Sequence, residues 1–65
     1  MKEPMHIHLY RKYAVWHMDI TSGAFAGAQD VETGFQAFLK ARVVKAEFLK
    51  AFPDAVVTFA ERDNF

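Results

Sequence analysis

Two runs of alternating apolar and polar side chains dominate the first third of the chain. Residues 5–20 read MHIHLYRKYAVWHMDI. Alternation with period two predicts a β-strand that turns one face to the core. The apolar positions are odd-numbered before Arg11-Lys12 and even-numbered after it, and a continuous strand cannot change parity without a turn or a bulge. We therefore expect a β-hairpin over residues 5–20, with a tight turn at Arg11-Lys12 or a four-residue loop from Tyr10 to Tyr13.

The two faces of this hairpin differ in chemistry. In the expected register Ile7 faces Trp16, and His6 faces His17. The core face then holds Met5, Ile7, Leu9, Ala14, Trp16, Met18 and Ile20. The outer face holds His6, His8, Tyr10, Tyr13, Val15, His17 and Asp19. A surface that gathers histidines and tyrosines in this way is a candidate for binding.

Apolar residues recur at helical spacing in the middle of the chain. Residues 21–29 are small and contain two glycines, which predicts a loop. Asp30 is a suitable N-cap, Gly34 weakens the first turn, and Pro53 ends the pattern. A helix over residues 30–52 is expected, and its apolar side holds Val31, Phe35, Phe38, Leu39, Ala41, Ala46, Phe48, Leu49 and Phe52.

Residues 55–60, AVVTFA, form a short β-branched and aromatic run that predicts a third strand. Val57 and Phe59 are expected to face the helix, and residues 61–65 are read as a polar tail. The fold class is α+β, a single β-β-α-β domain over residues 1–65 with one helix on one face of a three-stranded sheet. The order 2-1-3, with the first strand central and the third antiparallel to it, is favoured over 1-2-3.

Composition narrows the possible functions. The 65 residues contain no cysteine, eight basic and eight acidic side chains, and a sequence pI near 6.8. Disulfides and thiolate metal sites are therefore excluded, and overall charge offers no general attraction to nucleic acid or to anionic membranes. No apolar run approaches the ~20 residues that span a bilayer, so we expect a cytoplasmic protein. A domain this small has a thin margin of stability, which favours dimerisation.

Candidate partner-binding residues lie around the predicted hairpin turn. Tyrosines give large contact area at small entropic cost, so this surface favours a protein partner. The candidates are His8, Tyr10, Arg11, Lys12, Tyr13, Val15 and His17. The predicted helix carries more apolar surface than a narrow sheet can cover, which suggests a homodimer interface. The candidates for that interface are Arg42, Val44, Lys45, Phe48 and Phe52.

Two other uses of the outer face remain open. Aromatic side chains beside Arg11 and Lys12 could stack on single-stranded nucleic acid, although the motif of an RNA-recognition sheet is absent. His6, His8 and His17, with Asp19 nearby, could bind zinc or nickel, but solvated histidines are the favoured interpretation and no metal or cofactor is predicted. The chain has no nucleophile motif and no glycine-rich phosphate loop, so we expect it not to be an enzyme.

Size and type suggest one further analogy. Short, cysteine-free, neutral α/β domains are common among phage and mobile-element proteins, and some of these, including anti-CRISPR proteins, inhibit host machinery. This is an argument from fold class alone. The expected function is therefore a non-catalytic protein-binding module, homodimeric, that blocks or scaffolds a larger partner.

Overall fold

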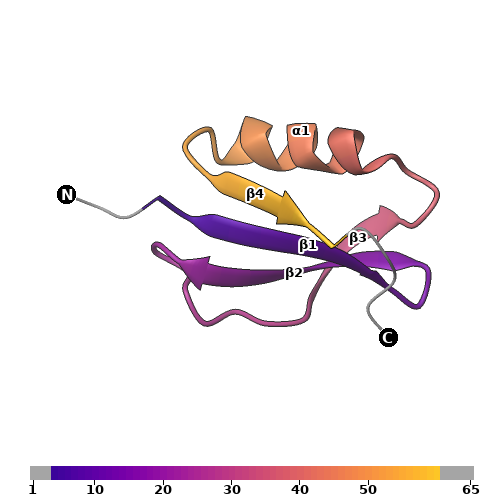
Figure 1. The fold of residues 1–65 in the computed structure, drawn as a ribbon, viewed down its shortest axis with the longest axis horizontal. Coiled ribbons are helices and arrows are strands. Elements are labelled where there is room, and N and C mark those ends of the chain that lie inside the picture. The colour runs from indigo at the N-terminus through magenta and orange to yellow at the C-terminus, as the bar shows by residue number, and fades with distance from the viewer. Residues whose placement is uncertain (1–3, 61–65) are drawn as a thin grey trace.

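The computed structural model describes residues 4–60 and contains one helix and a four-stranded mixed sheet (Figure 1). The elements are β1 (His6–Lys12), β2 (Val15–Ser22), β3 (Val31–Gln36), α1 (Ala41–Ala51) and β4 (Val56–Phe59). The strand order is β3-β2-β1-β4. The predicted α+β class is confirmed, but the sheet has four strands where three were expected. The expected tail, residues 61–65, lies outside the described residues.

The hairpin of β1 and β2 has the expected faces but a different turn. Ile7 pairs with Ile20, Leu9 with Met18, and Tyr10 with His17. The turn is Tyr13-Ala14, with φ angles of 52° and 65°, instead of Arg11-Lys12 or the loop from Tyr10 to Tyr13. Positive φ at both central residues is the geometry of a type I′ hairpin turn. The shift of register by four residues keeps the residues of β1 and β2 on their predicted faces, but Ala14, predicted on the core face, is exposed in the turn.

Residues 31–36 form an edge strand, so the prediction of a helix starting at Asp30 was wrong. β3 pairs antiparallel with β2, and its pairing is irregular between Val15 and His17. Gly34 has a φ of 84° beside this irregularity, a conformation that glycine adopts without strain. The Thr33 hydroxyl donates to the Trp16 carbonyl at 2.8 Å, so a side chain replaces a backbone bond where the ladder breaks.

The helix α1 is less than half as long as predicted because residues 31–40 belong to β3 and to the following turn, and Asp30 belongs to the loop before β3. Lys40, not Asp30, is the N-cap, and the Phe52 N–H bonds to the Phe48 carbonyl at 2.8 Å just before Pro53. Val44 and Phe48 are four residues apart and turn toward the sheet. The opposite side of α1 is largely charged.

The last strand lies where it was predicted but runs the other way. β4 is beside β1, as the favoured order required, yet the two strands are parallel. The unpredicted β3 explains this, because α1 crosses from β3 to β4 and such a crossover joins parallel strands. β3 is antiparallel to β2 and hence parallel to β1, so β4 is parallel to β1 as well.

The core lies between α1 and the inner face of the sheet. Leu9 and Val44 are completely shielded from solvent, and the two central strands, β1 and β2, contribute two buried residues each. The six residues of the buried cluster are Ile7, Leu9, Trp16, Ile20, Val44 and Val57. Trp16 meets Phe59 edge-on at 5.9 Å between ring centroids. Val57 and Phe59 thus face the helix side, as predicted.

Candidate functional site

The outer face of the sheet carries a stack of three rings centred on Tyr10. The His8 and Tyr10 ring centroids are 6.1 Å apart, and those of Tyr10 and His17 are 5.8 Å apart, with interplanar angles of 26° and 18°. These rings come from β1 and β2 and share one face because His8, Tyr10 and His17 have outward parity. Tyr10 is nevertheless only 6% exposed. It therefore supports the fold, and in the monomer it offers little surface to the partner that the sequence analysis assigned to it.

Asp30 closes over this stack from the loop that joins β2 to β3. The Tyr10 hydroxyl donates to Asp19 Oδ1 at 3.1 Å and to Asp30 Oδ1 at 3.0 Å. The Asp30 N–H donates to Asp19 Oδ1 at 2.7 Å, and Lys12 Nζ lies 2.9 Å from Asp30 Oδ2. His17 Nδ1 is 3.2 Å from Asp30 Oδ1 but, among the described groups, has no hydrogen-bond partner. These contacts fasten the loop to the sheet.

The ionisation of the network follows from these contacts. Burial, together with hydrogen bonds to Asp30 and Asp19, raises the pKa of Tyr10 well above its ordinary value. The hydrogen bond from Lys12, and then that from Tyr10, lowers the pKa of Asp30. The hydrogen bond to Asp30 raises the pKa of Lys12. Near neutral pH the group thus contains a neutral phenol between carboxylates, with an ammonium at one side.

Acid should weaken this attachment of the loop. Because the pKa of Asp30 is lower in the fold, its stabilising effect is present above the ordinary carboxyl pKa of about 3.9 and is lost as the pH falls through the folded value. We expect Asp30→Asn to lower the urea midpoint of unfolding at pH 7 and to matter less at pH 3. If the urea midpoints of wild type and Asp30→Asn differed by the same amount at both pH values, the ionised Asp30 would not be what holds the loop.

The most exposed aromatic side chains lie together at one end of the sheet. Phe38 is 82% exposed and Tyr13 is 74% exposed. The Ala37 N–H donates to the Ala14 carbonyl at 2.9 Å, so the β1–β2 turn and the β3–α1 turn lie side by side. Tyr13 directly precedes Ala14, and Phe38 directly follows Ala37. Figure 1 shows both turns at the same end of the molecule as the start of α1. Tyr13 was predicted as a contact residue, whereas Phe38 was assigned to a helix face.

Basic residues are close to these two rings in the sequence. Lys12 Nζ lies 5.9 Å from the centre of the Tyr13 ring. Lys40 and Arg42 are exposed at the start of α1, where the helix dipole adds a partial positive charge. Arg11 is half-buried at the end of β1. We call this surface, made by Lys12, Tyr13, Phe38, Lys40 and Arg42, the turn end. The half-buried Val15, also a predicted contact residue, follows the turn in β2.

The predicted dimer surface on the helix does not form one exposed apolar patch. Val44 is buried in the core of the monomer, so its side chain cannot also contact a second subunit. Phe48 and Phe52 are half-buried against the core, and Phe48 meets Phe35 edge-on at 5.9 Å. Arg42 and Lys45 are exposed. The apparent excess of apolar surface came from residues 31–39, which belong to β3 and its following turn.

The histidines do not gather as expected. His6 pairs with Ser22 and His17 with Tyr10, so His6 and His17 are not cross-strand neighbours. His8 Nδ1 lies 2.9 Å from the Thr58 hydroxyl oxygen, and the Tyr10 ring stands between His8 and His17. Within residues 4–60 no group of three histidine or acidic side chains is arranged to hold a metal ion.

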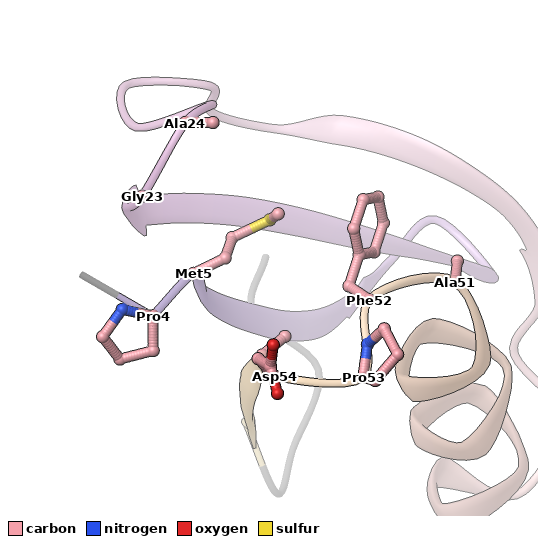
Figure 2. Close-up of a pocket in the computed structure, with 9 residues that line it drawn as sticks. Pro4, Met5, Gly23, Ala24, Ala51, Phe52, Pro53 and Asp54 are labelled. Atoms are coloured by element: carbon pink, nitrogen blue, oxygen red, sulfur yellow. The ribbon is translucent and has the colours of Figure 1, made fainter. Parts of the chain in front are cut away.

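A shallow depression of about 780 Å³ lies at the end opposite the turn end. Figure 2 shows Met5, which precedes β1, and Phe52, which follows α1, on its two sides. Gly23 has a φ of 91°, and a Cβ there would lie 2.9 Å from the Met5 Cα, so glycine is needed where the loop passes the chain. Asp54 is the one charged residue among those that line the depression. It offers apolar contact and a single carboxylate.

Comparison with protein-family models, with curated proteins and with solved structures returned no match. Among the described residues no helix is long and apolar enough to cross a membrane. The fold and the site define a small α+β domain with a four-stranded mixed sheet, a network that ties one loop to its outer face, and an exposed aromatic and basic turn end.

Proposed function

We propose that this protein is a non-catalytic binding module that contacts a partner protein through the turn end. The observation that carries the proposal is the exposure of Tyr13 and Phe38 on two adjoining turns. Large rings that remain in water in a small domain are characteristic of interface residues. The hydrogen-bonded network below holds β1, β2 and the loop before β3 together, so the turns are presented on a rigid support.

The charge of the turn end indicates the chemistry of the partner. Lys40 and Arg42 are exposed at the start of α1, close to Phe38 in the sequence, and Lys12 is paired with Asp30. An acidic surface with an apolar depression for the two rings would complement this arrangement. By binding a partner in this way, so small a domain could block or scaffold it. Blocking or scaffolding a larger partner is also the function expected from the sequence.

Single-stranded nucleic acid is the second candidate, because exposed rings beside basic side chains also stack on bases. The local excess of Lys12, Lys40 and Arg42 supports this candidate, although the overall charge of zero does not. Nucleic-acid binding would weaken steeply with salt. A labelled oligonucleotide that binds at low salt and dissociates at moderate salt would favour this candidate over a protein partner.

Capture from a lysate of the source cells tests the main proposal. Tagged wild type should retain a partner protein that the double variant Tyr13→Asn, Phe38→Ser loses, because both rings are removed. Asparagine tolerates the positive φ at position 13, so the turn should persist. The capture is measured by mass spectrometry of the bound fraction, with the melting temperature of each variant as the check on folding.

The matched control is Phe25→Ser, which removes an exposed ring from the β2–β3 loop instead. This control should retain the same partner as wild type. If the double variant captures that partner equally well, or if the control loses it too, the turn end is not the contact surface. Nuclease treatment of the lysate separates a direct protein contact from one that depends on nucleic acid.

A further inference from the structure

In the part of the chain that the structure describes, no strand pairs with the outer edge of β4. β4 is the last strand of the sheet beside β1. The Val56 N–H bonds to the Met5 carbonyl and the Ala60 N–H to the Leu9 carbonyl, both at 2.8 Å. Backbone direction alternates along a strand, so residues 56, 58 and 60 turn their backbone groups to β1. The N–H and C=O groups of Val57 and Phe59 consequently point away from the sheet, toward the open edge.

The two edges of this sheet differ in the features that prevent pairing. β3 carries Glu32, a glycine with positive φ and an irregular ladder, all of which discourage the addition of a strand. Residues 55–60, AVVTFA, contain neither a charge nor a proline. Val56 is 43% exposed on the outer face of β4. The edge formed by β4 therefore lacks the protection that the edge formed by β3 has.

We propose that two copies of this chain pair through their β4 edges, antiparallel about a two-fold axis at Thr58. In this register Val57 faces Phe59 of the second copy, so four backbone hydrogen bonds form between the two strands. Val56 then meets Ala60, and the two Thr58 side chains face each other on the outer face, a favourable cross-strand pair. The pairing joins two four-stranded sheets into one continuous sheet.

A second copy fits this edge for reasons of charge and symmetry. An uncharged strand paired with itself brings no like charges together, and the chain as a whole has zero net charge. A two-fold contact is the commonest form of self-association. β4 ends at the same end of the sheet as β1, so antiparallel pairing directs the two turn ends to opposite ends of the dimer. The dimer contact lies on β4 and not on the helix surface expected from the sequence.

Cross-linking tests the register directly. The chain has no cysteine, and facing residues in a non-hydrogen-bonded antiparallel pair have Cα atoms about 4.5 Å apart, within the range of a disulfide. Thr58→Cys should form a covalent dimer under mild oxidation at micromolar protein concentration. Gln36→Cys, exposed on the other edge, is the matched control and should form no covalent dimer. Cross-linking of the two variants at equal rates would overturn the proposal, as would equal rates in folded protein and in urea.

Charge reversal tests the same axis without a covalent bond. Thr58→Lys should weaken the dimer roughly fivefold, because like charges face each other at the two-fold. Thr58→Val is the control, since it also loses the contact with His8 but adds no charge. A mixture of Thr58→Lys and Thr58→Glu should recover association. Sedimentation equilibrium measures each dimer. Wild type that sediments as a monomer at millimolar concentration, or equal dimerisation of the lysine and valine variants, would refute the contact.

Discussion

Leu9→Ala should remove most of the stability of this domain. Leu9 is completely buried in the central part of the sheet, between β2 and β4 and under α1. Truncation of a buried leucine costs about 3–5 kcal/mol, because the apolar transfer energy is lost and a cavity remains. Domains have roughly 0.05–0.15 kcal/mol of stability per residue, which is about 3–10 kcal/mol for a chain of this size. We therefore expect a fall in Tm of more than 15 °C, or a chain that is largely unfolded at room temperature.

The control for this prediction is Val43→Ala, which truncates an exposed apolar side chain on α1. Alanine has the higher helix propensity, so stability should change by less than about 0.5 kcal/mol. Urea denaturation followed by Trp16 fluorescence measures both variants. If Leu9→Ala lost no more stability than Val43→Ala, Leu9 would not be at the centre of the core, and the order of strands around β1 would have to be revised.

The faces of the hairpin were predictable because side chains alternate along a strand whatever its register. Ile7, Trp16 and Ile20 are buried as expected, and the same would hold for any shift by an even number of residues. The register itself was not predictable. Hairpin turns with two positive φ angles usually contain Asn-Gly, and Tyr13-Ala14 carries no such signal. The turn was predicted at Arg11-Lys12 instead, because two charges interrupt the apolar pattern there.

The helix was placed too early because one set of residues fits two periods. Val31, Phe35 and Phe38 have helical spacing, while Val31, Thr33 and Phe35 alternate with period two. Pairing with β2 decided between them, and that is a tertiary effect. Gly34, which weakens a helix but suits an irregular strand, was the local feature that favoured a strand here. The direction of β4 then followed from β3 and could not be predicted without it.

The candidate site was only partly visible in the sequence. The alternation of side chains placed Tyr10 and His17 on the outer face, which is correct. It did not predict that Tyr10 would be buried there. Asp30 reaches Tyr10 from a loop twenty positions away, and no periodic pattern records such a contact. Phe38 was missed because it was assigned to the apolar side of a helix. A turn after a strand that ends at Gln36 would have left that ring in water.

Tyr10→Phe should be the most informative single-atom change on the outer face. The variant keeps the stacked ring and removes the hydroxyl that donates to Asp19 and Asp30. Hydrogen bonds to charged groups contribute about 1.5–3 kcal/mol, and the one O–H group that Asp19 and Asp30 share would be lost. We expect a loss of about 2 kcal/mol and a fall in Tm of roughly 10 °C. Tyr13→Phe makes the same change on a tyrosine that is 74% exposed and should cost less stability than Tyr10→Phe.

Alkaline pH should reproduce the effect of Tyr10→Phe in the wild type. Because the fold raises the pKa of Tyr10, the stability that its protonated hydroxyl contributes is present below the ordinary tyrosine pKa of about 10 and is lost as the pH rises above it. In a Tyr13→Phe background the ultraviolet absorbance of tyrosinate reports Tyr10 alone, since the chain has two tyrosines. Its ionisation should coincide with unfolding measured by circular dichroism, and Tyr10→Phe should lose less stability between pH 9 and 11. Ionisation of Tyr10 near pH 10 in a chain that stays folded would show that the phenol is solvated and that Asp30 does not hold the loop.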